Sequence, residues 1–407
     1  MSYHALAPSH GRYAIRRSTV VAMFFALVCA NAGSLLIRSG LQSEIWMLIY
    51  GATALWCLHD WGRTKGAFWM HAVVFLPPLY AILSTFWSIA PMQTAWSGVQ
   101  FLMTTIIAVR IAMSIDPKRA LVVAGGVYAV GISLSLLNVA TGFMAPVWEH
   151  NGALLGIYTQ KNMMGKAAVM GGLILVGLAR LYRIPLLPVV IYIGLFAVVR
   201  MAMSAGALMT YLLVPALFFL AMVSRRSAQV RAVWIIFPLL ALTLVGLAYV
   251  GSGGSPITAL LEFTGKSPTL TGRTVIWQFG LESFREHPLL GVGFKAYWAV
   301  DSFAIRYIHA TIEDGLFWFH NIYIEMLVGG GILGAAIMAL VIVRFLRQAL
   351  RWIVRSGSVV AILWGMILLV SLFAGLSDNV TFTLHGLNHV LIVMGYVFAT
   401  RALREQL

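Results

Sequence analysis

The sequence predicts an all-α protein that crosses a membrane about twelve times. Of its 407 residues, 60% are hydrophobic and only 10% are charged, whereas a soluble domain carries about 25% charged residues. Mean hydropathy is +0.89, and apolar runs of about 20 residues, the length of a spanning helix, recur along the chain. This composition excludes a disordered chain, a collagen and an ordinary cytosolic enzyme. It also argues against a nucleic-acid partner as the reason for the net charge of +15.

Each spanning helix is predicted from an apolar run that is bounded by charged, glycine or proline residues. Cys29 and Cys57 lie within these runs and are expected to be small buried packing residues. The predicted spans are 19–37, 44–59, 67–88, 94–113, 119–140, 162–180, 185–201, 204–223, 232–250, 321–343, 358–377 and 381–400.

The basic residues are distributed as the positive-inside rule requires. With the N-terminus in the cytoplasm, the predicted inner segments hold 18 of the 28 Lys and Arg residues and 3 of the 13 Asp and Glu residues, which accounts for the whole net charge of +15. Every predicted inner loop is basic, so both termini are expected in the cytoplasm. The charge is therefore a topology signal.

One predicted outer segment, 251–320, is much longer than the others. A loop of more than about 12–15 residues is usually functional or disordered, and the aromatic residues Trp277, Trp298 and Trp318 argue against disorder. We expect a subdomain on the outer face with an amphipathic helix at about 272–287, capped by Thr271. The chain is accordingly divided into spans 1–9 (1–250), this loop (251–320) and spans 10–12 (321–407).

Arg273 lies in the first turn of that predicted helix. A helix N-terminus presents free N–H groups and the positive end of its dipole, and an arginine beside it suits a phosphate or pyrophosphate. The alternative is an arginine that reaches lipid phosphates from the membrane interface. Arg285, near the end of the same helix, is a second candidate substrate contact or a solvated surface residue.

His320 and Asn321 stand where the long loop re-enters the membrane. The unperturbed pKa of histidine, about 6.5, suits general-base work near neutral pH. Glu325 is close enough along the chain to orient it or another group, and Asn321 is a candidate substrate contact. The alternative is a histidine that anchors the membrane interface among aromatic residues.

A third polar cluster, Gln160, Lys161 and Asn162 with Lys166 one turn later, stands at the entry to the sixth span. It offers cations and amide donors for phosphate or sugar hydroxyls. A charge one turn into the lipid zone is costly and often functional, although Lys161 could equally reach lipid headgroups. Arg200, near the outer end of the seventh span, is a weaker candidate.

Two other patterns are assigned structural roles. His385 and His389 are predicted on one face of the last span, but two histidines without a third ligand rarely bind metal, so neither a metal nor a cofactor is expected. Gly329, Gly330, Gly331 and Gly334 permit close helix packing in lipid. No strand precedes these glycines, so they do not indicate a dinucleotide loop.

Together these residues resemble the signature of the O-antigen ligase and O-antigen polymerase family. The 159–162 element is similar to that of exopolysaccharide polymerases of the ExoQ type. The resemblance covers roughly 270–335, with support at 155–170, and is more specific for the family than for one member. It rests on Gly272-Arg273, Trp277, residues 287–294 (HPLLGVGF), His320-Asn321, residues 331–334 (GILG) and residues 159–162 (TQKN).

The resemblance implies a membrane-embedded, GT-C-like, metal-independent inverting glycosyltransferase of the bacterial inner membrane. Its donor would be a glycan on undecaprenyl pyrophosphate at the periplasmic face, and its acceptor another lipid-linked repeat unit (polymerase) or lipid A-core (ligase). Arg273 would bind the pyrophosphate, His320 would deprotonate the acceptor, and Lys161 would add a second contact. Membrane lipids, a flippase and a chain-length-control protein are the implied partners.

The sequence departs from the family at Met203-Ser204-Ala205-Gly206, where members often carry a Ser-Arg pair whose arginine is a second pyrophosphate ligand. Arg200 and Lys161 are the candidates to replace it. A transporter or flippase for the same lipid-linked sugars is the alternative from another class. It is disfavoured because no carboxylate falls in the middle of a predicted span and no internal repeat is evident.

Overall fold

A computed structural model describes residues 10–223, 272–312, 316–378 and 382–405 of the chain. Across these residues the regular elements are all helices, apart from an isolated bridge between Trp148 and Leu154. The all-α class predicted from the sequence is therefore confirmed for the described part of the chain. The ninth predicted span, 232–250, and Thr271 lie outside it.

The described helices form two compact units, each considered by itself. The first comprises residues Met1–Ala67 and Ala108–Met203, in which α1 packs on α2 and α6, and α7 packs on α6 and α8. Its helices are α1 (His10–Ala32), η1 (Ile37–Ser39), α2 (Gln42–His59), α6 (Pro117–Thr141), α7 (Lys161–Leu181) and α8 (Leu187–Met201). Two helices, α3 (Trp61–Met70) and α5 (Pro91–Ala112), continue from one unit into the other.

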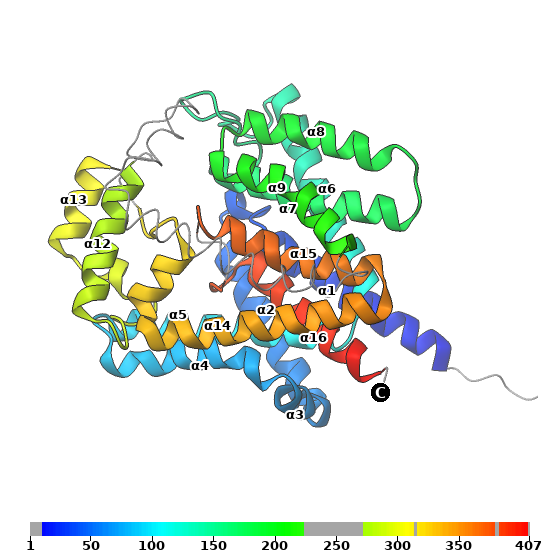
Figure 1. The fold of residues 1–407 in the computed structure, drawn as a ribbon, viewed down its shortest axis with the longest axis horizontal. Coiled ribbons are helices and arrows are strands. Elements are labelled where there is room, and N and C mark those ends of the chain that lie inside the picture. Colours follow the sequence, from blue (N-terminus) through cyan, green and yellow to red (C-terminus); the bar gives the residue numbers. More distant parts are fainter. Residues whose placement is uncertain (1–9, 224–271, 313–315, 379–381, 406–407) are drawn as a thin grey trace, which may run out of the picture. The chain divides into compact units, whose positions relative to one another are not determined.

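The second unit comprises Phe68–Ile107 and Ser204–Leu407. The long helix α14 is its central element, because α4, α12, α15 and α16 all pack against it (Figure 1). Its helices are η2 (Ala72–Phe75), α4 (Leu76–Leu83), η3 (Ser84–Trp87), α9 (Ala205–Val223), α12 (Arg273–Glu286), η5 (Tyr297–Ala299), α13 (Phe303–Thr311), α14 (Ile322–Ser356), α15 (Val359–Ala374) and α16 (Leu387–Arg404).

Four described helices, α5, α6, α7 and α14, are long and apolar enough to cross a membrane, and a fifth span results if one bent pair is counted as a single span. Helices α8 and α15 are apolar but shorter; the 15 residues of α8 extend about 22 Å, less than the hydrocarbon core of about 30 Å. The chain is therefore a multi-pass membrane protein, and the count of twelve spans stays a prediction.

The third predicted span, 67–88, is not one straight helix. The chain bends by 86° between Trp61–Met70 and Ala72–Trp87. The second arm contains α4, whose first turn holds Pro77 and Pro78. Proline has no N–H to donate to the preceding turn and clashes with its carbonyl, so a continuous helix cannot run through this segment.

Helix α14 is longer than predicted and is interrupted at Gly331, where φ is 61° and ψ is −165°. The segment 288–293 lies along this break: Val292 N–H donates to the Val328 carbonyl over 2.9 Å, and Ile332 N–H donates to the Pro288 carbonyl over 2.8 Å. A Cβ on Gly331 would lie 2.4 Å from the Leu289 carbonyl carbon. Gly329 and Gly331 therefore admit this loop backbone, which corrects the helix-packing prediction for these two residues. Gly330 and Gly334 instead lie against Tyr80 of α4, as that prediction requires.

The predicted outer loop contains a compact subdomain built on α12 and α13. Its buried side chains form one hydrophobic cluster with the first turns of α14. Burial of each large side chain in such a cluster contributes about 1.5–3 kcal/mol, so α12 is held firmly against α14. The cluster consists of Ile276, Val292, Tyr297, Trp298, Ile305, Ile308, Leu316, Phe319, Ile324 and Val328.

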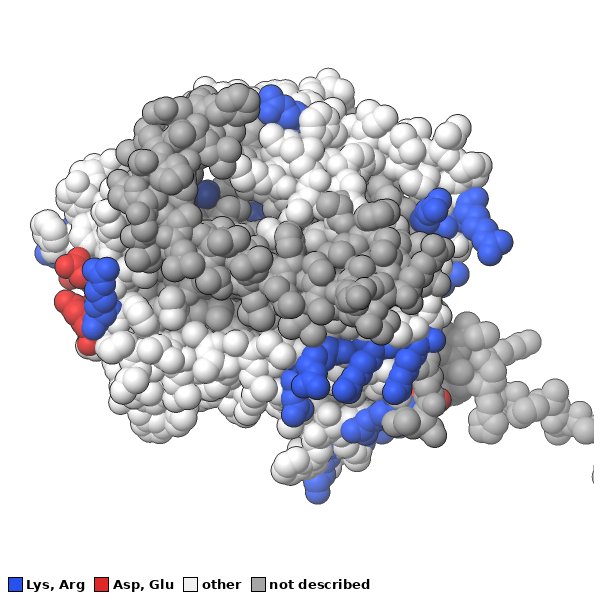
Figure 2. Space-filling view, viewed as in Figure 1, with Lys and Arg blue, Asp and Glu red and all other residues white. Residues whose placement is uncertain are grey.

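The charges of the second unit are separated along it. Arg344, Arg347, Arg351 and Arg355 recur every three or four residues on the exposed side of the last turns of α14. Figure 2 shows Lys and Arg side chains in a row near this part of α14, whereas the acidic side chains that gather in the same view lie over α12 and α13. The two regions were predicted on opposite sides of the membrane.

The predicted histidine pair on the last span is wrong. Helix α16 begins at Leu387, so His385 precedes it, with a φ of 59°. The His385 N–H donates to Thr104 Oγ1 over 3.3 Å, and His389 Nε2 lies 2.9 Å from Thr105 Oγ1. Both histidines therefore interact with α5, and they do not share one helix face.

Candidate functional site

His320 lies in a tight turn immediately before α14. Its φ is 51°, a conformation that non-glycine residues rarely adopt and that is often found at functional sites. Asn321 holds one side of the turn, because its Oδ1 accepts hydrogen bonds from Tyr323 N–H (3.0 Å) and Ile324 N–H (3.3 Å) and so caps α14. On the other side, Glu325 Oε2 accepts a hydrogen bond from Phe319 N–H over 3.2 Å.

The same turn is bonded to the end of α15. Ile322 N–H donates to the Gly375 carbonyl (2.9 Å), and Asn321 Nδ2 donates to the Leu376 carbonyl (3.3 Å). Gly375 permits this approach, since a Cβ there would lie 2.5 Å from Ile322 Cγ2. Residues 377 and 378, which follow α15, are thereby brought beside His320.

The imidazole of His320 contacts two side chains through Nδ1. Trp318 Nε1–H donates to Nδ1 over 3.0 Å, and Asp378 Oδ1 lies 3.5 Å from the same atom. His320 is only 8% exposed and Asp378 only 7%. Because a carboxylate favours a proton on Nδ1 and the indole N–H favours a lone pair there, Nδ1 is the atom at which the histidine tautomer is decided.

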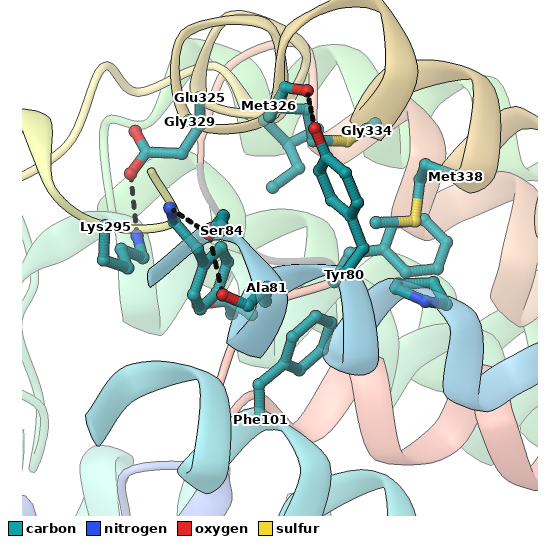
Figure 3. A pocket seen from close by; sticks show the side chains of 16 residues that line it. Tyr80, Ala81, Ser84, Phe101, Lys295, Glu325, Met326, Gly329, Gly334 and Met338 are labelled. Atoms are coloured by element: carbon teal, nitrogen blue, oxygen red, sulfur yellow. Dashed lines mark hydrogen bonds and ion pairs between the residues drawn. The ribbon is translucent and has the colours of Figure 1, made fainter. Parts of the chain in front are cut away.

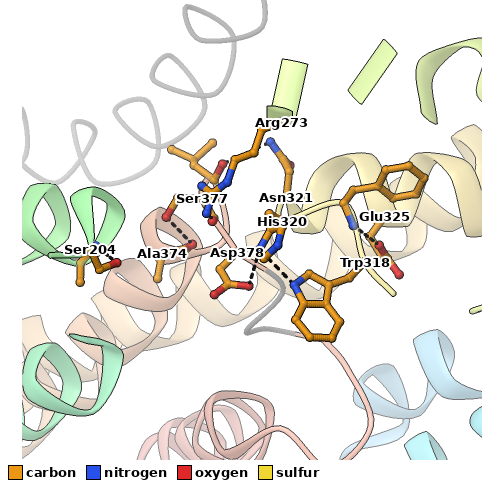
Figure 4. A network of polar contacts seen from close by, with 12 residues as sticks. Ser204, Arg273, Trp318, His320, Asn321, Glu325, Ala374, Ser377 and Asp378 are labelled. Atoms are coloured by element: carbon orange, nitrogen blue, oxygen red, sulfur yellow. Dashed lines mark hydrogen bonds and ion pairs between the residues drawn. The ribbon is translucent and has the colours of Figure 1, made fainter. Parts of the chain in front are cut away.

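Arg273 joins this cluster from α12. Its Nη1 donates to the Ser377 carbonyl over 2.9 Å, directly beside Asp378 in the chain (Figure 4). Trp277, one turn along α12, donates from Nε1 to the Phe319 carbonyl over 2.7 Å. Helix α12 begins as predicted at about residue 272, although its N-cap is Gly272 in a left-handed conformation. We refer to Arg273, Trp318, His320, Ser377 and Asp378 as the polar network.

The start of α9 packs against this network. Ser204 is 8% exposed, and a Cβ on Gly206 would lie 2.1 Å from Ser377 Oγ. A side chain at 206 would therefore push α9 away from Ser377. The segment Met203-Ser204-Ala205-Gly206, where the sequence departs from the family pattern, therefore contacts Ser377 of the polar network through Gly206.

The lysine cluster lies in the first unit, where Lys161 is the first residue of α7. Its Nζ lies 2.6 Å from Glu149 Oε2, and Asn151 Nδ2 donates to the same oxygen over 2.7 Å. The two charged side chains are 30% and 33% exposed. Lys161 is therefore present as one half of an ion pair at the edge of the loop before α7.

Arg38 organises that loop. Its guanidinium donates to the carbonyls of Met144, Pro146 and Tyr158, while Asn138 Nδ2 donates to those of Met144 and Gly156. Burial lowers the pKa of Arg38 from its ordinary value, but an arginine stays protonated in proteins. The 142–160 loop, which carries Glu149, is therefore pinned by a fixed cation.

The remaining predicted contacts are placed as follows. Gln160 is the N-cap residue of α7, without a side-chain capping bond, and Asn162 and Lys166 are half-buried in its first two turns. Arg200 is exposed in the last turn of α8, and the neighbouring Met201 carbonyl accepts a hydrogen bond from the loop residue Leu154. All four residues belong to the first unit, whereas the polar network belongs to the second.

Arg285 does not join the polar network. It is exposed near the end of α12, and twelve residues of helix separate it from Arg273, about 18 Å along the axis. Asn321 is close to the network, but its side chain caps α14 and binds a carbonyl. It is therefore first of all a positioning residue.

Sequence reasoning missed Asp378 and Ser377. One signal was available for Asp378, because it is the only acidic residue between Glu325 and Glu405. Ser377 contributes its backbone carbonyl, which no sequence pattern can identify. Over the part of the chain that the structure describes, no group of three or more His, Cys, Asp or Glu side chains is placed to hold a metal ion.

Two comparisons with known proteins bear on this site. Residues 190–339, which include Arg273 and His320, match the Wzy_C family, described as O-antigen ligase. The chain is also 27% identical over 323 residues to the exopolysaccharide production protein ExoQ of Rhizobium meliloti (strain 1021), across 72% of this chain and 68% of that protein. Both comparisons confirm the predicted resemblance to the O-antigen ligase and polymerase family.

Proposed function

We propose that this protein is a metal-independent inverting glycosyltransferase that joins oligosaccharide repeat units carried on undecaprenyl pyrophosphate, at the periplasmic face of the bacterial inner membrane. The observation that carries the proposal is the pairing of a cation with a base. Arg273 is anchored on Ser377, and His320 faces the next residue, Asp378. A sugar-pyrophosphate donor needs both groups at once.

Arg273 acts on the leaving group. As the bond between the anomeric carbon and the pyrophosphate oxygen breaks, negative charge develops on the pyrophosphate. A guanidinium and the N-terminus of α12 stabilise that charge without a metal ion. The Ser377 carbonyl orients the guanidinium, and the hydrophobic cluster under α12 keeps it in place.

His320 acts on the acceptor. It must accept a proton on Nε2, which requires the other nitrogen, Nδ1, to carry one. Asp378 stabilises that tautomer by accepting from Nδ1–H and then stabilises the imidazolium. Trp318 donates to Nδ1 in the opposite tautomer. A shift of the Nδ1 contact from Trp318 to Asp378 would therefore convert the resting histidine into a base.

The step balances with these groups alone. The acceptor hydroxyl oxygen forms a bond to the anomeric carbon from the face opposite the pyrophosphate, and its proton passes to His320 Nε2. The anomeric carbon–oxygen bond to the pyrophosphate breaks, and its electron pair leaves with the polyprenyl pyrophosphate. The anomeric configuration is inverted once per transfer.

The separation of charges along the second unit supports the proposed orientation. The exposed arginines at the end of α14 suit the cytoplasmic side, and the subdomain that carries Arg273 is at the opposite, N-terminal end of that helix (Figure 2). Lys161 is assigned a second contact to the pyrophosphate or glycan, and Gln160 and Asn162 offer amide groups to the same ligand.

Substitution of the two central residues tests the proposal. Arg273→Ala and His320→Ala should each abolish polymer in cells while the protein still inserts in the membrane at normal levels. Arg306→Ala is a matched control, because Arg306 is an exposed partner of Asp301 in the same subdomain. Polymer at wild-type levels in either test variant would show that the residue lacks its assigned role.

An O-antigen ligase is the second candidate, favoured by the family description of residues 190–339. Glycan analysis of a deletion strain separates the two. Loss of secreted polymer with normal lipopolysaccharide indicates a polymerase. Uncapped lipid A-core, with polymer left on the lipid carrier, indicates a ligase.

A transporter or flippase of the same lipid-linked glycans is the alternative from another class. Purified protein in vesicles with a lipid-linked oligosaccharide decides between them. Longer glycans and released lipid pyrophosphate identify an enzyme, whereas movement across the bilayer without new bonds identifies a transporter.

Flippases and chain-length-control proteins are the partners that a polymerase would need.

A further inference from the structure

An ion pair beside the turn that holds His320 has no role in the chemistry described so far. Lys295 Nζ lies 2.8 Å from Glu325 Oε1 (Figure 3), and the two side chains are 16% and 9% exposed. They line a pocket whose other walls are mostly apolar, among them the rings of Phe101 and Phe294. Burial of either charge alone would be strongly unfavourable, so the two residues form one unit in this structure.

The backbone around Lys295 is strained and firmly held. Lys295 has a φ of 60°, which a residue with a Cβ rarely adopts. Phe294 N–H donates to Ser84 Oγ over 3.1 Å, and Ala296 N–H donates to the Gly293 carbonyl over 3.1 Å. Strained residues persist only where the surrounding structure over-determines them, and they gather at functional sites. The strain at Lys295 therefore points to a function for the pair.

Glu325 connects Lys295 to the residue that precedes His320. Its Oε1 binds Lys295, and its Oε2 accepts a hydrogen bond from Phe319 N–H over 3.2 Å. Trp277 Nε1 donates to the carbonyl of the same phenylalanine over 2.7 Å. Both backbone groups of Phe319 are therefore held by side chains, one from α14 and one from α12.

The side chain of Phe319 is held as well. Phe319 is 1% exposed, and its ring centroid lies 4.9 Å from those of Tyr297 and Trp298. Trp318 and His320 stand on either side of it in the chain, and the indole of Trp318 donates to His320 Nδ1. A shift of Phe319 would therefore displace the base and its hydrogen-bond donor together.

We propose that Lys295 and Glu325 are positioning residues for His320, an inference that rests on the function proposed above. Lys295 fixes the carboxylate of Glu325, and that carboxylate fixes Phe319 and with it the strained turn at His320, whose φ is 51°. A displacement of about 1 Å at a catalytic group can lower a rate by about 10²-fold. The pair therefore acts on kcat and leaves donor affinity, assigned to Arg273, unchanged.

A matched pair of double variants tests the acceptor oxygen of Glu325. Lys295→Met with Glu325→Gln removes both charges but keeps an amide oxygen that can accept the Phe319 N–H. Lys295→Met with Glu325→Met removes the acceptor as well. Both should fold, because neutral side chains of similar volume commonly replace a buried ion pair without loss of stability. In transfer assays on full-length protein in nanodiscs, we expect kcat to be about 30-fold lower in the second variant than in the first, at an unchanged KM for the donor.

Exchange of the two charges shows whether the ion pair alone is sufficient. Lys295→Glu with Glu325→Lys can re-form the pair, but the ammonium at position 325 cannot accept the Phe319 N–H. We expect its kcat to stay about 30-fold below wild type even where its thermal unfolding midpoint is normal. Asp301→Arg with Arg306→Asp is the matched control, because that pair is exposed in the same subdomain. Its kcat should change by less than about twofold.

Two results would overturn the proposal. One is equal kcat in the two neutral double variants, and the other is wild-type kcat in the charge-exchanged protein. Either would show that the pair of Lys295 and Glu325 is merely structural. If the charge-exchanged protein does not fold, the comparison of the two neutral variants decides alone.

Hydrogen exchange at the Phe319 amide gives a readout that needs no substrate. In a peptide that spans 316–322, this amide should exchange faster in the variant with Glu325→Met than in the variant with Glu325→Gln, and equal exchange contradicts the proposal. Failure of the proposed function looks different. A wild-type protein that transfers no glycan, with this difference in exchange intact, removes the reaction assigned to His320 and leaves the hold on its turn in place.

Discussion

The molecule has two candidate anion contacts, and they are built differently. In the second unit, Arg273 donates to the neutral carbonyl of Ser377 over 2.9 Å. In the first unit, Lys161 lies 2.6 Å from the charged carboxylate of Glu149. The guanidinium is oriented by a backbone carbonyl within the polar network, whereas the ammonium lies on a partly exposed carboxylate at the edge of a loop.

This difference ranks the two cations. A phosphate that approaches Lys161 must compete with Glu149, and the pair is partly exposed. A surface ion pair contributes only about 0–1 kcal/mol, so exchanging Glu149 for a phosphate is feasible but adds little binding free energy. At Arg273 the incoming phosphate adds a charge-assisted, two-pronged contact. We therefore expect the reaction to depend strongly on the polar network and weakly on Lys161.

The largest effect is expected for the base. His320→Gln keeps a polar side chain but cannot accept a proton, and general-base catalysis contributes about 10²–10⁴-fold. We expect kcat for glycan transfer to fall by about 10³-fold, with little change in donor affinity. Single-turnover transfer and donor binding, measured on one preparation, check this. A variant that loses donor binding and transfer in proportion would show that His320 is a binding residue.

Asp378→Asn tests the carboxylate that sequence reasoning missed. The amide cannot stabilise a proton on Nδ1 or the imidazolium, so we expect kcat to fall by about 10²-fold. Single-turnover transfer and donor binding, measured on the same variant, check this. Transfer at the wild-type rate would show that the carboxylate does not act on His320, and a matching loss of donor binding would show a merely structural role.

Arg273→Lys separates charge from geometry at the stronger cation. The ammonium keeps the charge but loses the planar fork that binds two phosphate oxygens and the Ser377 carbonyl together. We expect a drop of about tenfold in kcat/KM, far smaller than the loss in Arg273→Ala. If the two variants are equally inactive, the guanidinium geometry is what the reaction requires and its charge alone is not enough.

The smallest effects are expected for the ion pair of Lys161 and Glu149. Substitution of the two residues should change the KM for the donor in opposite directions. Lys161→Ala should raise the KM for the donor by about threefold, the order of 0.6 kcal/mol, as for an exposed ion pair. Glu149→Gln, which frees Lys161 from its carboxylate, should lower KM by a similar factor. Salt titration of both variants provides the check, and a tenfold or larger loss in Lys161→Ala would reverse the ranking of the two cations.

Several features could be predicted from the sequence because they are local. Apolar runs and basic loops indicate a helical membrane protein. The start of α12 near 272 and the re-entry at His320 follow from capping, proline and aromatic positions. The glycines at 329–334 predicted close helix packing, which Gly330 and Gly334 provide beside Tyr80 of α4. The 288–293 loop that borders Gly331 could not be predicted in the same way.

What only the tertiary structure decided is which distant residues meet. Ser377 and Asp378 reach Arg273 and His320 because hydrogen bonds between residues 321–323 and the end of α15 join residues that are 49 to 55 positions apart. Glu149 reaches Lys161 because Arg38, over 100 residues away, holds the intervening loop. A hydropathy pattern reports burial along one helix. It carries no information on which backbone carbonyl or which carboxylate lies beside a given cation. Those contacts, at Arg273 and at Lys161, are what distinguish the two candidate sites.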